Sequence, residues 1–260
     1  MKRKNVLLLA TITILFIACS TPKQATAPTV MRVPAKFDFS PPSRVKSGST
    51  NITIAIVKPT YVGQNPEYFV PPFNEMASSM GNDFEELLTA KGFTVRGPFG
   101  SRDEMVYNDK INSNFVLEIS IQLNPQYNRK FTTSQKVKLG SIINPYSNLQ
   151  FNTTHKMHGE ITLSGYLVVN AKSSQFGELI WKKNIALDPA SFNYDGSIIW
   201  KEDVPTMADE LKLDNLVYNT LSSELQKFYM KSLNLAWQQI DPEEMKSVSE
   251  QAKKADKKGA

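Results

Sequence analysis

The chain has 260 residues, of which 41% are hydrophobic and 21% are charged, the composition of an ordinary soluble globular protein. Its formal charge is +5, but Lys2, Arg3 and Lys4 supply three of the positive charges, so the remaining excess does not indicate nucleic acid as a partner. Cys19 is the only cysteine, which excludes an internal disulfide and a metal site built from several cysteines.

Residues 1–18 predict a lipoprotein signal peptide. The short cationic head is followed by an uncharged, mostly apolar run that is shorter than the roughly 20 residues a membrane-spanning helix needs. The run ends in Phe16-Ile17-Ala18-Cys19, which resembles a bacterial lipobox, the motif whose cysteine is acylated and becomes the first residue of the mature protein. We therefore expect lipidation at Cys19 and stable anchoring to a membrane. The alternative is a plain signal peptide with an incidental cysteine.

Residues 19–50 predict an extended tether, because they combine several prolines and scattered cations with no regular apolar period. Ser20 and Thr21 follow the cysteine, in place of the aspartate associated with inner-membrane retention in many Gram-negative bacteria. We therefore expect a lipid anchor in the outer membrane, with the protein either surface-exposed or periplasm-facing.

The predicted globular domain covers residues 51–240 and opens with a strand and a helix. Ile52, Ile54 and Ile56 alternate on one face of a strand. Apolar residues at three- and four-residue steps over 73–88, followed by Lys91 and Gly92, predict an amphipathic helix.

Four shorter elements are expected to follow. Residues 93–95 predict a short strand, 97–100 a turn rich in glycine and proline, and 102–110 a short helix. Alternation of apolar and polar residues over 115–123 predicts a half-buried strand.

The segment between Glu118 and Glu160 contains no acidic residue, and it predicts an outlying hairpin or long surface loop. Its basic residues are Arg129, Lys130, Lys136, Lys138 and Lys156, interleaved with Tyr127, Phe131, Tyr146 and Phe151. One interpretation is a patch for an anionic ligand such as a sialylated glycan. The other is a solvated edge hairpin whose lysines prevent unwanted strand pairing.

The last third of the chain predicts a β-hairpin followed by helices. Alternation over 157–169 and 179–187 predicts two paired strands, with a short edge strand at 197–201. Residues 213–237 carry one apolar helical stripe with Asp214 as a candidate N-cap, and 241–260 predict a C-terminal helix and a fraying Lys-rich tail. The pattern predicts one α+β domain, with a mostly antiparallel sheet and helices packed on one side.

Neither catalysis nor metal binding is expected. His155 and His158 are the only histidines, and residues three apart in a strand point to opposite faces, so they cannot chelate one metal. The sequence contains no HExxH, no nucleophile elbow and no phosphate-binding glycine loop, and its carboxylates read as solvated faces. We therefore expect a protein that is not an enzyme and that needs no cofactor.

The order of these features resembles the neuraminyllactose-binding hemagglutinin family, the HpaA-like lipoproteins of the Helicobacter type. Besides the lipobox, the resemblance rests on Ile54–Pro59, Phe84–Val95, Met157–Glu160 and Gly177–Leu179. The family has a proposed sialic-acid motif, a basic run that ends in Gln-Lys-Lys. The corresponding ligand-binding residues here are Arg129, Lys130, Gln135, Lys136 and Lys138, with extra residues between the two basic pairs and Val137 interrupting the second.

Two functions of different class follow. In the first, the protein is an outer-membrane adhesin that binds sialylated glycans through this basic patch. In the second, it is a structural or assembly lipoprotein of the cell envelope, or of a sheathed appendage, and the patch docks a protein partner or the anionic membrane surface.

Overall fold

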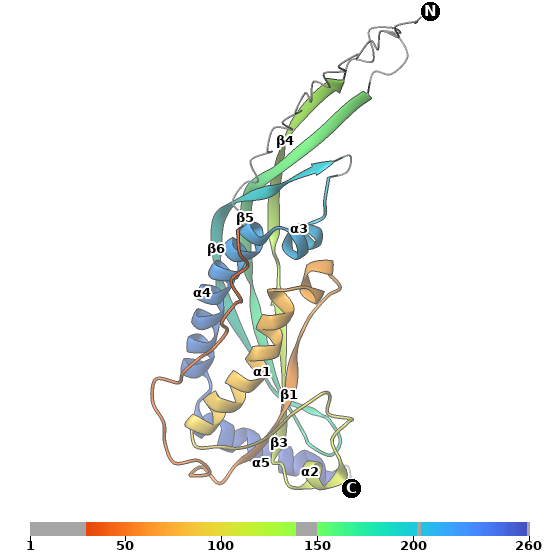
Figure 1. Cartoon of the computed structure of the whole chain (residues 1–260). Coiled ribbons are helices and arrows are strands. Elements are labelled where there is room, and N and C mark those ends of the chain that lie inside the picture. Colours follow the sequence, from red (N-terminus) through yellow and green to blue (C-terminus); the bar gives the residue numbers. More distant parts are fainter. Residues whose placement is uncertain (1–29, 139–149, 202–203, 259–260) are drawn as a thin grey trace, which may run out of the picture. The chain divides into compact units, whose positions relative to one another are not determined.

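The computed structural model describes residues 30–138, 150–201 and 204–258 (Figure 1). The predicted signal peptide and Cys19 lie outside the described residues. Residues 31–260 form one unit, built on a six-stranded mixed sheet whose helices pack on one face, as the sequence predicted.

The sheet has the order β2-β1-β3-β5-β4, and β6 pairs with the other edge of β5. The strands are β1 (Thr53–Tyr61), β2 (Thr94–Phe99), β3 (Phe115–Leu123), β4 (Gln126–Lys138), β5 (Gln150–Lys172) and β6 (Leu179–Lys201). β1 is parallel to β2 and to β3, because a helix crosses over between β1 and β2. The three pairings that involve β5 are antiparallel.

The strand β5 organises the sheet because one of its edges pairs with two different strands along its length. Residues 165–172 pair with β3, and residues 150–162 pair with β4. β6 follows the opposite edge of β5 and reaches Lys201, so the predicted edge strand at 197–201 is the end of β6. We call the part built from residues 126–138, 150–162 and 191–201 the arm (Figure 1).

The helical layer consists mainly of α1 (Phe73–Ala90), α4 (Asn215–Gln239) and α5 (Pro242–Lys258). The predicted stripe of α1 is buried except for the partly buried Ala77, and it joins the alternate inward residues of the strands in one core. Asp214 caps α4 as predicted, because its carboxylate accepts hydrogen bonds from the amides of Leu216 and Val217. The shorter helices are η1 (Pro66–Phe69), α2 (Tyr107–Ile111) and α3 (Met207–Leu213).

The central strands are covered on both faces. Ala55, Val57 and Val116 point away from the main core and pack under Met105 and Phe99. This explains why β1 and the first residues of β3 are more uniformly apolar than a strand with one wet face.

The predicted tether, residues 19–50, is wrong for its described part. Phe37 and Phe39 are buried in the main core, and the Phe39 amide donates to the Asp83 carboxylate at 2.8 Å. Val45 and Thr50 donate to carbonyls of the α1 C-terminal region. The alternation of Phe37 and Phe39 is the only sequence sign of this packing, and it is too short to stand out among the prolines.

The C-terminal boundary also changes. The predicted helix at 241–260 is present, but α5 continues to Lys258, and Met245, Val248 and Ala252 are buried in the same core as the sheet. Since segments on both sides of 51–240 complete the core, the domain extends beyond those limits.

Two smaller expectations differ from the structure. Residues 97–99 of the turn predicted at 97–100 belong to β2, where a register shift opposite Ala55 and Val57 accommodates Gly97 and Pro98. Pro98 is tolerated because β2 is an edge strand. The helix predicted at 102–110 is limited to the five residues of α2.

Candidate functional site

The five predicted ligand-binding residues lie on β4, which pairs with β5 in a hairpin, but they do not converge. The register of β4 against β5 is continuous, so Arg129 and Gln135 belong to one face of the strand, and Lys130, Lys136 and Lys138 to the other. Arg129 and Lys138 are also about 30 Å apart along an extended strand. A single compact sugar site cannot use all five residues.

The Arg129 side chain has a structural role in the fold. Its guanidinium forms an ion pair with Glu210 of α3, and it donates to the Pro205 carbonyl at 2.6 Å. Glu210 is fully buried, and burial raises its pKa although Arg129 opposes that shift. The buried Tyr194 of β6 lies beside both groups, and burial raises its pKa as well. The interaction therefore fastens α3 to the base of the arm, and the charge of Arg129 is already neutralised.

Lys130 points to the opposite, solvent-facing side of the sheet. It lines a shallow hollow of about 300 Å³ together with Asn128, His158, Glu160, Asn193 and Asp195. Two carboxylates within the same hollow oppose the binding of an anionic sugar, although the amide side chains could bind hydroxyl groups.

The two histidines occupy opposite faces of β5, as the sequence analysis expected. His155 is buried against Phe131 and lies 3.1 Å from the Thr133 hydroxyl, whereas His158 lines the hollow beside Lys130. Among the described residues, no group of three or more His, Cys, Asp or Glu side chains could hold a metal ion.

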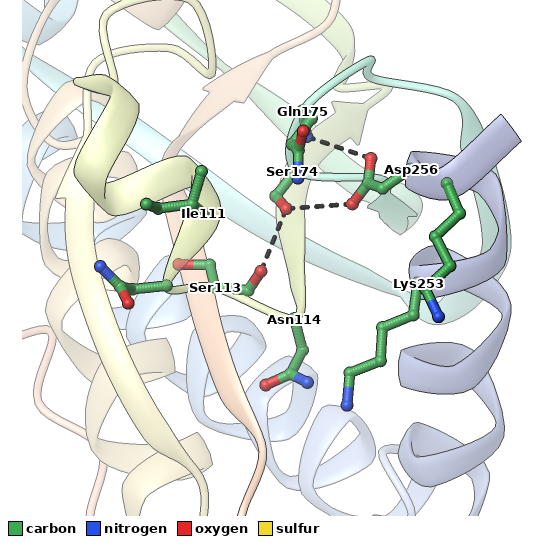
Figure 2. A pocket seen from close by; sticks show the side chains of 9 residues that line it. Ile111, Ser113, Asn114, Ser174, Gln175, Lys253 and Asp256 are labelled. Carbon is green, nitrogen blue, oxygen red and sulfur yellow. Dashed lines mark hydrogen bonds between the residues drawn. The ribbon is translucent and has the colours of Figure 1, made fainter. Parts of the chain in front are cut away.

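A different pocket lies at the far end of β5, where the chain turns into β6 (Figure 2). It has a volume of about 380 Å³ and lies between the loop that precedes β3, the β5–β6 turn and the last turns of α5. Ile111, Ser113, Asn114, Ser174, Lys253 and Asp256 are among its lining residues.

Hydrogen bonds hold the walls of this pocket together (Figure 2). The Ser174 hydroxyl lies 3.0 Å from the Ser113 carbonyl oxygen and 3.3 Å from Asp256 Oδ2. Asp256 Oδ1 accepts a hydrogen bond from the backbone amide of Gln175 at 3.3 Å. The side-chain nitrogen of Asn114 donates to Ser249 Oγ at 2.9 Å, and its side-chain oxygen accepts from the backbone amide of Thr53 at 2.7 Å. α5, β3 and the turn are thereby fixed relative to one another.

The pocket carries an excess of positive charge. Lys253 and Lys257 are exposed and lie one turn apart on α5, and neither has a carboxylate partner within the described part of the chain. The Asp256 carboxylate is occupied by the turn. Lys254 and Lys258 are exposed on the same last turns of the helix.

Exposed apolar side chains gather on the two segments that border this pocket. Val106, Tyr107 and Ile111 belong to α2 and its start, Phe176 belongs to the β5–β6 turn, and Leu179 is the first residue of β6; all five are 45% to 75% exposed. The Arg102 guanidinium donates to the Gln175 carbonyl at 3.1 Å, which joins the two segments. We call this region, with the pocket and the α5 lysines, the α2 end.

Sequence reasoning missed the α2 end. The lysines at 253–258 looked like a fraying tail, and the apolar residues of α2 and of the turn have no periodicity that marks a surface. The available signal was the presence of Phe176 in the β5–β6 turn, where polar residues are the norm, with Leu179 directly after that turn.

Neither a protein-family model nor a curated protein matches the sequence. Among solved structures, the chain is similar to a homolog of neuraminyllactose-binding hemagglutinin from Helicobacter pylori, with a TM-score of 0.54 and 12% identity over 83% of this chain and 98% of that one. What the two share is a fold.

Two further matches are much weaker. A lipoprotein from Neisseria meningitidis has a TM-score of 0.23 and 12% identity over 68% of this chain and 99% of that one. A minor lipoprotein from Acinetobacter baumannii has a TM-score of 0.17 and 9% identity over 70% of this chain and 93% of that one. In the described part of the chain, no helix has the length and hydropathy of a membrane span.

Proposed function

We propose that the protein is a lipid-anchored, non-enzymatic lipoprotein of the outer membrane that acts in the structure or assembly of the cell envelope by docking a protein partner. The anchor is Cys19, for which the lipobox and the signal-peptide pattern are the support. The fold shared with the hemagglutinin homolog is compatible with this role but does not select it.

The observation that carries the docking function is the α2 end. Large exposed apolar side chains in one region of a folded surface mark an interaction site more often than scattered ones do. The neighbouring pocket adds a cationic, hydrogen-bonding element in Lys253, Lys257 and Asn114. A partner segment that combines aromatic or aliphatic side chains with carboxylates fits both features.

The experiment is photo-crosslinking in intact cells. A photoreactive residue at Tyr107 or Phe176 should give one discrete adduct with an identified envelope protein, and Lys253→Glu combined with Lys257→Glu should abolish it. The control position is Asn184, which is exposed on the solvent-facing side of β6. The proposal is contradicted if neither Tyr107 nor Phe176 gives an adduct, or if Asn184 gives the same adduct in equal yield.

The second candidate function is adhesion to sialylated glycans. It is favoured by the name of the hemagglutinin homolog and by the Lys130, Asn128 and Asn193 side chains of the hollow, whereas Glu160 and Asp195 in the same hollow oppose it. A glycan array on the chain from Ser20 decides between the two: specific binding that is lost in Lys130→Gln supports adhesion, and absence of binding removes it. Arg129→Gln is not a clean test, because that change also unpairs Glu210.

A further inference from the structure

The arm has one face that is rich in lysine. Lys130 on β4 pairs opposite His158, and Lys156 on β5 pairs opposite Thr132, so both belong to the solvent-facing side of the sheet. The register places Lys136 and Lys138 at positions of that same face. Lys201 of β6, opposite Thr154, is the fifth lysine, and Glu202 and Asp203 follow it in the sequence.

Acidic residues are confined to the base of the arm. Glu160 lies opposite Asn128 and Asp195 lies opposite His158, on the same face as Lys130. Beyond them, residues 131–138 and 150–157 contain no Asp or Glu, and we call this part the outer arm. Its lysines are Lys136, Lys138 and Lys156, and Lys156 forms no ion pair with a carboxylate of the described residues.

The chain enters the folded unit at the base of the arm. Asn219 of α4 donates to the Met31 carbonyl and accepts from the Val33 amide, both at 2.8 Å. Arg32 donates to the Leu211 carbonyl in α3, and its guanidinium lies 3.8 Å from the centre of the Tyr218 ring. α3 is also the helix that carries Glu210, the partner of Arg129. Met31 is thus fixed beside the root of the arm, and not at the α2 end.

Chain length sets how far the folded unit can lie from an anchored Cys19. Eleven residues lie between Cys19 and Met31, and the twelve Cα–Cα steps that join these two residues span at most about 43 Å when fully extended. The arm extends about 30 Å from Arg129 to Lys138. A unit tethered by its Met31 side can therefore place the outer arm against the bilayer within the reach of its tether.

We propose that the lysine face of the outer arm binds the anionic phospholipid headgroups of the membrane in which the chain is anchored. This inference rests on the proposed lipid anchor for its geometry, but not for its chemistry. Lysines close to an anionic leaflet contribute about 1 kcal/mol each, and the attraction is screened within a Debye length, about 8 Å at physiological salt. The arm then acts as a second contact that orients the protein and turns the α2 end away from the bilayer.

The test uses the chain from Ser20, which lacks the anchor but retains every core residue of the unit that starts at Met31. Sedimentation with vesicles should show binding to mixtures of phosphatidylglycerol and phosphatidylcholine, and not to phosphatidylcholine alone. Replacing Lys136, Lys138 and Lys156 with Gln should weaken binding about a hundredfold, the equivalent of three lysines at about 1 kcal/mol each. Binding of the parent chain should also fall steeply between low and physiological salt.

The matched control removes the same charge at the α2 end by replacing Lys253, Lys254 and Lys257 with Gln. It should bind the vesicles as the parent chain does. If both triple variants lose vesicle binding to the same extent, only the net charge matters and the proposal is overturned. It is also overturned if the variant with Lys136, Lys138 and Lys156 replaced binds the vesicles as the parent chain does. Because no anchor is present, failure here leaves lipidation at Cys19 untouched, whereas loss of fatty-acid labelling in Cys19→Ser tests the anchor separately.

Discussion

At the scale of single residues, the ion pair between Arg129 and Glu210 decides how β4 is interpreted. A side chain that the sequence marks as a candidate ligand for a sialylated glycan instead neutralises a buried carboxylate. Nothing in the sequence near Arg129 shows this, because Glu210 is 81 residues away. The identity of the basic residues could be predicted, but their division into structural and exposed groups depends on tertiary contacts.

The first prediction follows from that ion pair. Arg129→Met should lower the free energy of unfolding by roughly 3–5 kcal/mol, because it leaves the Glu210 carboxylate buried without its partner. Lys130→Gln, its exposed neighbour on the same strand, should change that free energy by less than about 0.5 kcal/mol. Urea unfolding of both variants measures the difference. Equal, small effects would mean that Arg129 is not part of the folded framework.

The second prediction concerns Asp83, which accepts hydrogen bonds from the Phe39 amide and the Tyr229 hydroxyl. Burial raises the pKa of this carboxyl above its ordinary value of 3.8, although both hydrogen bonds oppose the shift. The folded protein therefore holds the proton more tightly than the unfolded chain, and this residue's contribution to stability decreases as pH rises from 3.8 to the raised pKa.

Asp83→Asn removes this titration while it preserves the shape of the side chain. The unfolding free energy of the parent protein minus that of the variant should fall with rising pH across this window and be flat above it. Chemical denaturation at a series of pH values measures the difference. A difference that rises with pH would contradict the direction of the shift.

At the scale of elements, Asp214 is more than the helix cap that its sequence position suggests. Besides the amides of α4, its carboxylate accepts from the Ser197 hydroxyl at 2.7 Å and from the Ile198 amide at 2.9 Å, both in β6. The cap was predictable from local sequence, because a capping residue precedes the helix directly. Its attachment to β6 was not, since it depends on where the sheet places Ser197.

The third prediction uses this double role. Asp214→Ala should destabilise the protein by roughly 2–4 kcal/mol, since it removes the cap and also the hydrogen bonds from Ser197 and Ile198 of β6 to a charged acceptor. Asp209→Ala, which removes an exposed capping contact of the short α3, should cost about 1 kcal/mol. Thermal or urea unfolding of the two variants provides the comparison. If the costs are equal, the connection between α4 and β6 contributes nothing.

Strand and helix patterns predicted most elements because each one buries a single face. The stripe of α1 and the alternation in β3 and β5 appear in the core where the sequence placed them, and so do Ile185 and Leu187 of β6, whereas Leu179 at the start of β6 is exposed. The length of β5 and its two successive partners could not be read from the pattern, because pairing partners are set by topology and not by local periodicity. The α2 end escaped prediction for the same reason: it is assembled from three separate segments.

At the scale of the whole molecule, the segment at 31–50 is part of the folded unit. Phe37 and Phe39 contribute two aromatic side chains to the main core, and the Phe37 ring contacts that of Tyr229 with centroids 5.2 Å apart. A chain that starts at Asn51 would leave the surface that they cover open to water. The boundary therefore has a measurable thermodynamic consequence.

The fourth prediction is that Phe39→Ala costs about 3–5 kcal/mol, the usual loss for a buried Phe side chain. Val33→Ala, an exposed position in the same segment, should be nearly neutral. A chain from Asn51 should melt well below one from Met31 in a calorimetric scan. Identical melting temperatures of the two chains would mean that residues 31–50 add no stability and act only as a tether.

In the orientation proposed above, the lipid anchor at Cys19 holds the protein at the membrane, the arm faces the bilayer and the α2 end faces away from it. The most direct measurement is energy transfer from a fluorophore on the lipidated full-length chain to acceptor-labelled headgroups in anionic membranes. The label is attached at Ser134→Cys on the outer arm or at Phe176→Cys at the α2 end; β5 extends for roughly 50 Å between Lys156 and Lys172. We expect efficient transfer from position 134 and little from position 176, with the contrast lost when Lys136, Lys138 and Lys156 are replaced by Gln. Equal transfer from both positions, or stronger transfer from position 176, would contradict this orientation.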